Sequence, residues 1–289
     1  MLHDLVRHSV VDETLAEISE VLGRDVLTLD SADALRSPVS VQLAIFAAGV
    51  STARALQRSG VRPLAVAGLS IGAFSAAVVA EAIELSEAVR LVRSRAEQME
   101  HLYPTGYGLA AIVGLSEAEV TKLVAVESTS AHPVYVGNIN APRQIVIAGS
   151  IEGMKGVLEK ALSQGARKAE LLDVPVPSHC PLLQPIADSL RVQLEAIPVQ
   201  DPKVIYIANV TARAVRTAKG VAKDLADNIA HGVRWHEATS VAQELGCELF
   251  LQMPPGHTLR DLVEENLSNV KANAITPDNF EKLLHLAMD

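Results

Sequence analysis

The chain has 289 residues, which suits one large domain or two smaller ones and is enough to bury a sizeable core without disulfides or metal ions. Hydrophobic residues make up 49% of it and aromatic residues only 3%, a balance typical of α/β proteins whose sheets are covered by helices. A net charge of −9 without a basic run argues against a nucleic-acid-binding surface, and two cysteines, Cys180 and Cys247, exclude a disulfide framework and fit a reducing cytoplasm.

The start of the chain and one uncharged stretch indicate where in the cell the protein is expected. Met1-Leu2-His3-Asp4 opens into polar sequence without a signal peptide, so we expect a cytoplasmic protein. Pro63 to Ala80 carries no charge over 18 residues, which touches the length of a membrane helix. Glycines interrupt its middle and its first part is better explained as a buried strand, so we expect no membrane span.

The first hundred residues predict a mainly helical region around one strand. Apolar spacing predicts helices over residues 11–23 and over Val39–Leu56, and a third helix from an N-cap at Ser86 through Leu102. Between them, Leu64–Ala67 is expected to be a strand and Ala73–Ala82 a helix rich in Ala and Val.

The segment between that strand and helix reads Gly68-x-Ser70-x-Gly72. A strand, a sharp turn around a serine and a helix are the context of a nucleophile elbow, in which the hydroxyl projects at a helix N-terminus. There the helix dipole and free N–H groups stabilise a developing oxyanion. We therefore interpret Ser70 as a nucleophile rather than a residue of a structural turn.

The middle of the chain changes character. Strands are expected at Gly108–Val113, Val134–Asn140, Gln144–Ala148 and Arg167–Val174, with helices over Ser116–Glu127 and Ile151–Gln164. The order βαββαβ is the ferredoxin-like pattern. We place this small domain at residues 106–175, inserted into a larger one.

The larger domain, residues 1–105 and 176–289, resumes with a proline-rich loop. Helices are expected over Leu182–Ile197, Ala222–Ala230 and His236–Leu245, and strands at Val204–Ala208 and Leu249–Gln252. This alternation predicts a mostly parallel, helix-covered sheet of the α/β class.

An activated serine needs a base, and His179 is the best-placed histidine. It lies in Pro177-Ser178-His179-Cys180-Pro181, where prolines restrict the backbone on both sides at the re-entry into the larger domain. The alternative is a histidine on a surface loop.

Arg95 falls among the inward-facing positions Leu91, Val92 and Met99 of its predicted helix. An unpaired guanidinium there is costly, so Arg95 needs an anion. The partner is either a glutamate of the protein or a substrate carboxylate held by a bidentate clamp.

Two asparagines, Asn138 and Asn140, precede an Ala-Pro turn and are interpreted as turn or capping residues, with a cleft-lining role as the alternative. No His-Glu-x-x-His motif or paired Cys/His spacing occurs, so we expect no metal site.

Five segments, in the same order along the chain, resemble the malonyl-CoA:acyl-carrier-protein transacylase family. They are Gly68–Gly72, Arg90–Arg95, Asn138–Gly149, Val174–Cys180 and Pro254–Leu259. The family has a hydrolase-like α/β domain with an inserted ferredoxin-like domain, in agreement with the predicted elements. The resemblance implies malonyl-CoA as substrate, an acyl carrier protein with a phosphopantetheine-type arm as partner, and no permanently bound cofactor.

The resemblance also implies roles for single residues. Ser70 corresponds to the acyl-accepting nucleophile, His179 to its base and Arg95 to the clamp for the malonyl carboxylate. Asn228 falls where the family, usually with Gln, supplies a backbone carbonyl that orients the histidine. The backbone N–H of Ile71 is the expected oxyanion donor.

The elbow departs from the family pattern Gly-His-Ser-x-Gly-Glu, because Leu69 and Ala73 replace the His and Glu. That version resembles the epsilon subunit of biotin-independent malonate decarboxylase, which loads malonyl onto a carrier subunit with a phosphoribosyl-dephospho-CoA arm. We favour this subfamily over the fatty-acid-synthesis enzyme and expect other malonate decarboxylase subunits as partners. Leu69, Asn140 and Gly256 are candidates for lining the cleft.

A second departure lies at the start of the chain. Family members begin with a strand and a Gly-Gln-Gly-x-Gln loop that supplies part of the oxyanion hole, whereas Met1–Leu5 resembles the segment after that loop. Either the start is assigned too late or the enzyme is impaired, since one lost oxyanion donor costs on the order of 10²–10³ in rate. Two other functions stay open: a serine hydrolase with a late histidine such as His257, and a non-catalytic assembly subunit.

Overall fold

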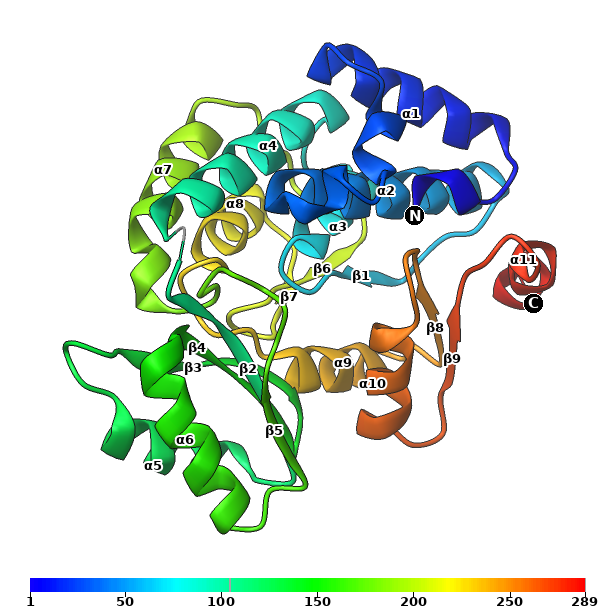
Figure 1. The fold of residues 1–289 in the computed structure, drawn as a ribbon. Coiled ribbons are helices and arrows are strands. Elements are labelled where there is room, and N and C mark those ends of the chain that lie inside the picture. Colours follow the sequence, from blue (N-terminus) through cyan, green and yellow to red (C-terminus); the bar gives the residue numbers. More distant parts are fainter. Residues whose placement is uncertain (104, 289) are drawn as a thin grey trace.

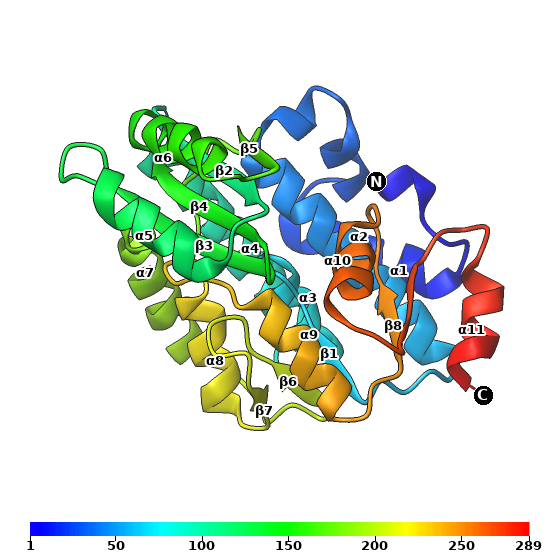
Figure 2. The same ribbon diagram turned by 90° about the horizontal axis from the view of Figure 1, so that it is seen from below.

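The computed structural model describes residues 1–103 and 105–288. Figures 1 and 2 show a larger part built from helices around short strands, and a smaller part in which a four-stranded sheet carries two helices. In the larger part, the helices α7 and α8 lie on one flank of the strands β1 and β6, and α10 and α11 lie on the other.

The first hundred residues form four α-helices, with three short 3₁₀ helices among them. Their bounds are α1 Ser9–Leu22, α2 Pro38–Arg58, α3 Gly72–Val79 and α4 Leu85–Leu102. The side chain of Ser37 caps α2 and Pro38 occupies its first turn, where the missing N–H costs nothing. The expected N-cap at Ser86 is wrong: Glu84 has the extended backbone of an N-cap, so Ser86 already lies inside α4.

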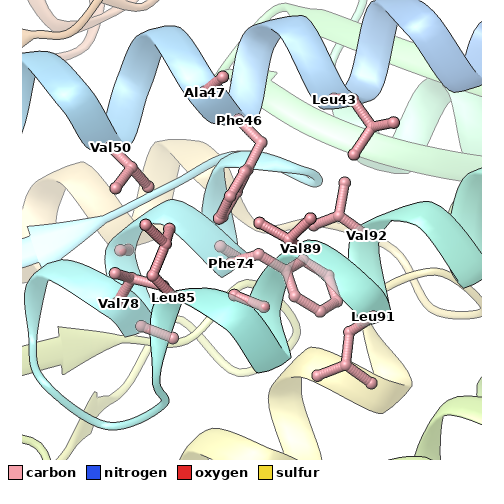
Figure 3. Packing of buried hydrophobic residues seen from close by; sticks show 14 of the residues in the cluster. Leu43, Phe46, Ala47, Val50, Phe74, Val78, Leu85, Val89, Leu91 and Val92 are labelled. Atoms are coloured by element: carbon pink, nitrogen blue, oxygen red, sulfur yellow. The ribbon is translucent and has the colours of Figure 1, made fainter. Parts of the chain in front are cut away.

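The main core forms where α2, α3 and α4 meet. Figure 3 shows Phe46 of α2, Phe74 of α3 and Val89 of α4 packed together, and all three are buried. Helix α3 is apolar on nearly every side because other elements surround it. Among the described residues, α2 is the one helix long and apolar enough to cross a membrane, and 78% of its apolar window is buried inside the protein.

The strands of the larger part form two short sheets. β1 (Ala65–Ala67) runs parallel to β6 (Ile205–Ile207), with Val66 opposite Tyr206, and β7 (Ala214–Val215) pairs with β6 in the antiparallel direction. β8 (Leu249–Gln252) and β9 (Lys271–Ala274) form a separate parallel pair. The carboxyl ends of β1 and β6 therefore lie side by side, which places Ser70 next to the loop after β6.

The remaining helices of the larger part follow β5 in the chain. They are α7 Gln184–Glu195, α8 Ala218–Asp227, α9 Trp235–Glu244, α10 Thr258–Asn266 and α11 Phe280–Met288.

The smaller part has the predicted βαββαβ order. Its elements are β2 Tyr107–Val113, α5 Glu117–Glu127, β3 Val134–Ala141, β4 Gln144–Ser150, α6 Ile151–Ser163 and β5 Lys168–Leu171. The strand order is β3-β4-β2-β5 with every neighbour antiparallel, as in a ferredoxin-like sheet. The helices α5 and α6 cover one face over an apolar core of their own.

The opposite face of this sheet contacts the larger part. Leu109, Val146 and Ala148 pack against Cys180, which directly follows His179. On β3, Ile139 donates its N–H to the Val233 carbonyl at 2.8 Å. This face of the sheet therefore packs against the loop that contains His179.

Candidate active site

The serine elbow forms where β1 turns into α3. Ser70 has φ +54°, a left-handed conformation that is uncommon for a residue other than glycine. Gly68 is required by close packing, because a Cβ there would lie 2.0 Å from the Gly72 carbonyl oxygen. A Cβ on Gly72 would meet nothing within 4 Å, so packing does not require a glycine at that position.

The backbone N–H groups at the elbow differ in their partners. The N–H of Ser70 donates to Asn209 Oδ1 at 2.9 Å. Within the described residues, the N–H of Ile71 has no hydrogen-bond acceptor, and it lies directly before α3. It is therefore free to donate to an oxyanion formed beside Ser70.

Arg95 reaches the serine from α4. Its side chain is 1% exposed, Nη2 donates to Ser70 Oγ at 2.9 Å, and Nη1 donates to the Gln42 side-chain oxygen. Gln42 lies on α2 and is itself buried, so two helices fix the guanidinium. Arg95 Nε has no partner in the described part of the chain.

The charge of Arg95 is not balanced by a carboxylate among the described residues, although the other arginine contacts of its helix are ion pairs with glutamates. Burial lowers the pKa of Arg95 from 12.5 to about 10, so the guanidinium keeps its proton at neutral pH. The alternative in which a glutamate of the protein pairs with Arg95 is therefore wrong for this part of the chain.

His179 is held by the end of α8. Its backbone has φ +65°, and its N–H donates to the Ile229 carbonyl at 2.7 Å. Its Nδ1 lies 2.6 Å from the backbone carbonyl oxygen of Asn228, the contact that the family resemblance implied. A carbonyl can only accept, so Nδ1 carries the proton and the Nε2 lone pair is available as a base.

The environment of His179 keeps its imidazole neutral. The side chain is 2% exposed, and burial together with the nearby Arg95 charge lowers its pKa from 6.5 to about 4, although hydrogen bonds to carbonyl groups oppose the shift. In the structure Ser70 Oγ is hydrogen-bonded to Arg95 and, among the described residues, not to His179.

The other expected residues lie around this centre or away from it. Leu69 packs in a cluster with Val233, Trp235 and Leu259 beside the elbow. Gly256 is exposed in the turn before α10, where its carbonyl accepts a hydrogen bond from Gln252 Nε2 at 3.0 Å. His257 is exposed as well and pairs with Asp261 at 2.5 Å.

The two asparagines of β3 are not turn residues, which corrects that interpretation. β3 continues through both of them to Ala141, and its pairing with β4 shifts register on either side of Asn138 and Ile139. Asn140 accepts a hydrogen bond from Asn266 Nδ2 on its carbonyl at 2.9 Å. The side-chain oxygens of both asparagines are buried and have no hydrogen-bond partner among the described residues.

Sequence reasoning missed three polar residues at this centre. Gln42 has a buried amide side chain in an apolar helix, and Asn209 follows a buried strand. Asp224 is on α8, and only 5% of its surface is exposed. A polar residue at the carboxyl end of a parallel strand is a usable indication of a site, and Asn209 has that position. In the described part of the chain, no group of three or more His, Cys, Asp or Glu side chains could hold a metal ion.

Known proteins match nearly the whole chain. A family model described as the acyl transferase domain matches residues 6–280. This chain belongs to the acyl transferase family. It is 34% identical to the malonyl CoA-acyl carrier protein transacylase of Escherichia coli K12 over 283 residues, covering 95% of this chain and 91% of that protein.

Solved structures of such transferases have the same fold. The malonyl CoA-acyl carrier protein transacylase from Coxiella burnetii superimposes with a TM-score of 0.93 at 30% identity, over 98% of this chain and 91% of the other. A malonyl-transacylase solved in complex with its type II polyketide synthase acyl-carrier protein gives a TM-score of 0.91 at 32% identity, over 96% and 92%. The resemblance to the malonyl-CoA:acyl-carrier-protein transacylase family and the fold class expected from the sequence are confirmed.

Proposed function

We propose that this acyltransferase moves a malonyl group from malonyl-CoA to the thiol of an acyl carrier protein through a malonyl ester on Ser70. The observation that supports it most is the buried Arg95 guanidinium, which touches Ser70 Oγ and has no carboxylate partner in the described residues. A buried cation of this kind is stabilised by a substrate anion. Malonyl carries a free carboxylate, and relatives at 34% identity are named for its transfer.

The proposed mechanism is acyl transfer in two halves. His179 Nε2 takes the Ser70 proton as Oγ attacks the thioester carbon, and the Ile71 N–H donates to the oxyanion. The C–S bond breaks, His179 returns the proton to the CoA sulfur, and malonyl remains on Ser70. A carrier thiol then attacks that ester with His179 as base, and the Ser70 oxygen leaves with the proton.

The carboxylate of the bound malonyl group would take over the Arg95 hydrogen bond that Ser70 Oγ accepts in the free protein. Ser70 would then be released to share its proton with His179. The Asn228 carbonyl would hold the imidazole as an aspartate does in a hydrolase triad.

The depressed pKa of His179 predicts how the reaction depends on pH. Because the imidazole loses its proton near pH 4, the second-order rate constant for Ser70 acylation is expected to stay constant from pH 8 to about pH 5 and to fall below that. Single-turnover acylation by malonyl-CoA across this range measures it. An inflection near pH 6.5 would show that His179 behaves as a solvated histidine and would contradict this base assignment.

Carrier dependence tests the function directly. The protein is incubated with malonyl-CoA and either a carrier bearing its phosphopantetheine arm or the same carrier without the arm. We expect a malonyl mass gain on the arm-bearing carrier alone, and none with Ser70→Ala. Rapid release of free malonate without a carrier would favour the serine hydrolase instead. That alternative has little support, because His257 pairs with Asp261 and, among the described residues, not with the serine.

We further propose that the carrier belongs to malonate decarboxylase, with other subunits of that assembly as partners in the cytoplasm. The support is the Leu69 and Ala73 form of the elbow, which resembles the epsilon subunit of that enzyme; Leu69 packs into an apolar cluster and Ala73 is fully buried at the start of α3. The test compares a carrier with a phosphoribosyl-dephospho-CoA arm against one with phosphopantetheine. Faster loading of the second would favour fatty-acid synthesis.

We also propose that residues 1–105 and 176–289 form the transferase domain and that 106–175 form an inserted domain. Separate apolar cores for the two parts support these boundaries. Asn140 and Gly256 stay candidates for the wall of the substrate cleft.

A further inference from the structure

We propose that Asn209 and Asp224 are positioning residues that hold the Ser70 elbow and the His179 base at a fixed spacing. This inference rests on the proposed role of Ser70 as the nucleophile. Neither residue touches the serine hydroxyl, so both would act through the backbone of the elbow.

The side-chain amide of Asn209 bridges the elbow. Its Oδ1 accepts the N–H of Ser70 and its Nδ2 donates to the carbonyl of Gly68, both at 2.9 Å. Asn209 is buried in the loop after β6. Its side chain links this loop to the residues that follow β1, just beyond the last paired residues of the two strands, Ala67 and Ile207. It thereby supports the left-handed backbone of Ser70, which costs energy unless its surroundings fix it.

Asp224 in turn holds Asn209. Its carboxylate accepts the backbone N–H of Asn209 at 3.0 Å, the N–H of Val210 at 3.1 Å and the hydroxyl of Tyr206 at 2.7 Å. In the described part of the chain no cation pairs with Asp224, although it is buried. A carboxylate kept inside the protein by hydrogen bonds alone fixes the geometry of every donor around it.

Helix α8 also positions the residue that holds His179. Asp224 lies one turn before the end of α8, and its carbonyl accepts the N–H of Asn228 at 2.9 Å. The Asn228 carbonyl then accepts a hydrogen bond from the Nδ1–H group of His179. The end of α8 therefore reaches the nucleophile through Asn209 and the base through Asn228, so a shift of Asp224 would change their separation.

The test compares Asn209→Ala with Asn279→Ala. Asn279 makes the same kind of bridge far from the elbow, since it accepts the N–H of Thr276 and donates to the carbonyl of Ala274, both at 2.9 Å. For each variant we would measure the single-turnover acylation rate, the half-saturating malonyl-CoA concentration, labelling of Ser70 by a fluorophosphonate, and the melting temperature.

Asn209→Ala is expected to lower acylation and fluorophosphonate labelling by about 10²-fold, since small misplacements of reacting groups cost that much. The half-saturating malonyl-CoA concentration should stay within about two-fold of the wild-type value, because the substitution leaves Arg95 in place. Asp224→Asn, which turns an amide N–H toward a backbone donor, should lower both rates by about 10-fold. Asn279→Ala should leave both rates unchanged even if its melting temperature falls equally.

Equal rates per folded molecule in Asn209→Ala and Asn279→Ala would overturn the inference and leave Asn209 a structural residue. Failure of the proposed function looks different, because the wild-type protein itself would then not be acylated. The fluorophosphonate lacks a carboxylate, so its labelling reports the elbow and the base without the Arg95 contact.

Discussion

Replacing Arg95 with alanine is expected to lower malonyl loading onto Ser70 by about 10²–10³-fold, while acetyl loading stays within a few-fold of the wild type. Removing one partner of a buried, hydrogen-bonded charge pair lowers a rate by roughly this factor. Here the pair would be the Arg95 guanidinium and the malonyl carboxylate. Acetyl loading is spared because the acetyl group has no carboxylate for the guanidinium. Loss of the Arg95 hydrogen bond also frees Ser70 Oγ to meet His179.

Rates of loading from malonyl-CoA and acetyl-CoA, each by single turnover, measure this change in specificity. Arg93→Ala is the matched control on the same helix, because Arg93 is exposed and pairs with Glu97 at 2.7 Å. Arg95→Lys should give an intermediate malonyl rate, since lysine keeps the charge and loses the planar fork. If Arg95→Ala slows both acyl groups equally, Arg95 supports the fold or the elbow and does not select the substrate.

Replacing His179 with alanine is expected to lower the acylation rate by about 10³-fold, within the range that a general base contributes. Binding of malonyl-CoA should change little, because the proposed carboxylate contact lies at Arg95. His285→Ala is the control, since His285 is exposed on α11 and likewise places Nδ1 against a helix carbonyl, at 2.8 Å from Glu281.

The pH profile of the residual activity adds a second test. In His179→Ala the fall below pH 5 should disappear, because the titrating imidazole is gone. A variant that keeps the wild-type rate, or keeps the same acid limb, would show that another group accepts the Ser70 proton.

The sequence predicted the elements around the elbow well, since residue spacing and turn chemistry are local properties. The strand before Gly68, the helix after Ser70 and the βαββαβ order of the smaller part all followed from such patterns. The strands β7 and β9 and the helices α10 and α11 were missed, because they are short and partly exposed. Their structure depends on packing against distant elements.

The site was only partly predictable for the same reason. Arg95 stood out as a charge among core positions, but its partner Gln42 lies 53 residues away. Asn209 is 139 residues from the serine whose N–H it accepts. No spacing rule joins such pairs. Glu84 and Gly72 show the limits of local rules as well, because the position of a cap or the need for a glycine depends on its neighbours in space.

The central claim is that malonyl-CoA acylates Ser70. Intact-protein mass spectrometry after brief incubation with malonyl-CoA tests it most directly, with Ser70→Ala alongside. We predict a gain of one malonyl group in the wild-type protein, which digestion and peptide mapping would then locate on the peptide that contains Ser70, and no gain in the variant. An unmodified wild-type protein, or an equal gain in Ser70→Ala, would contradict the proposed acyl-serine mechanism.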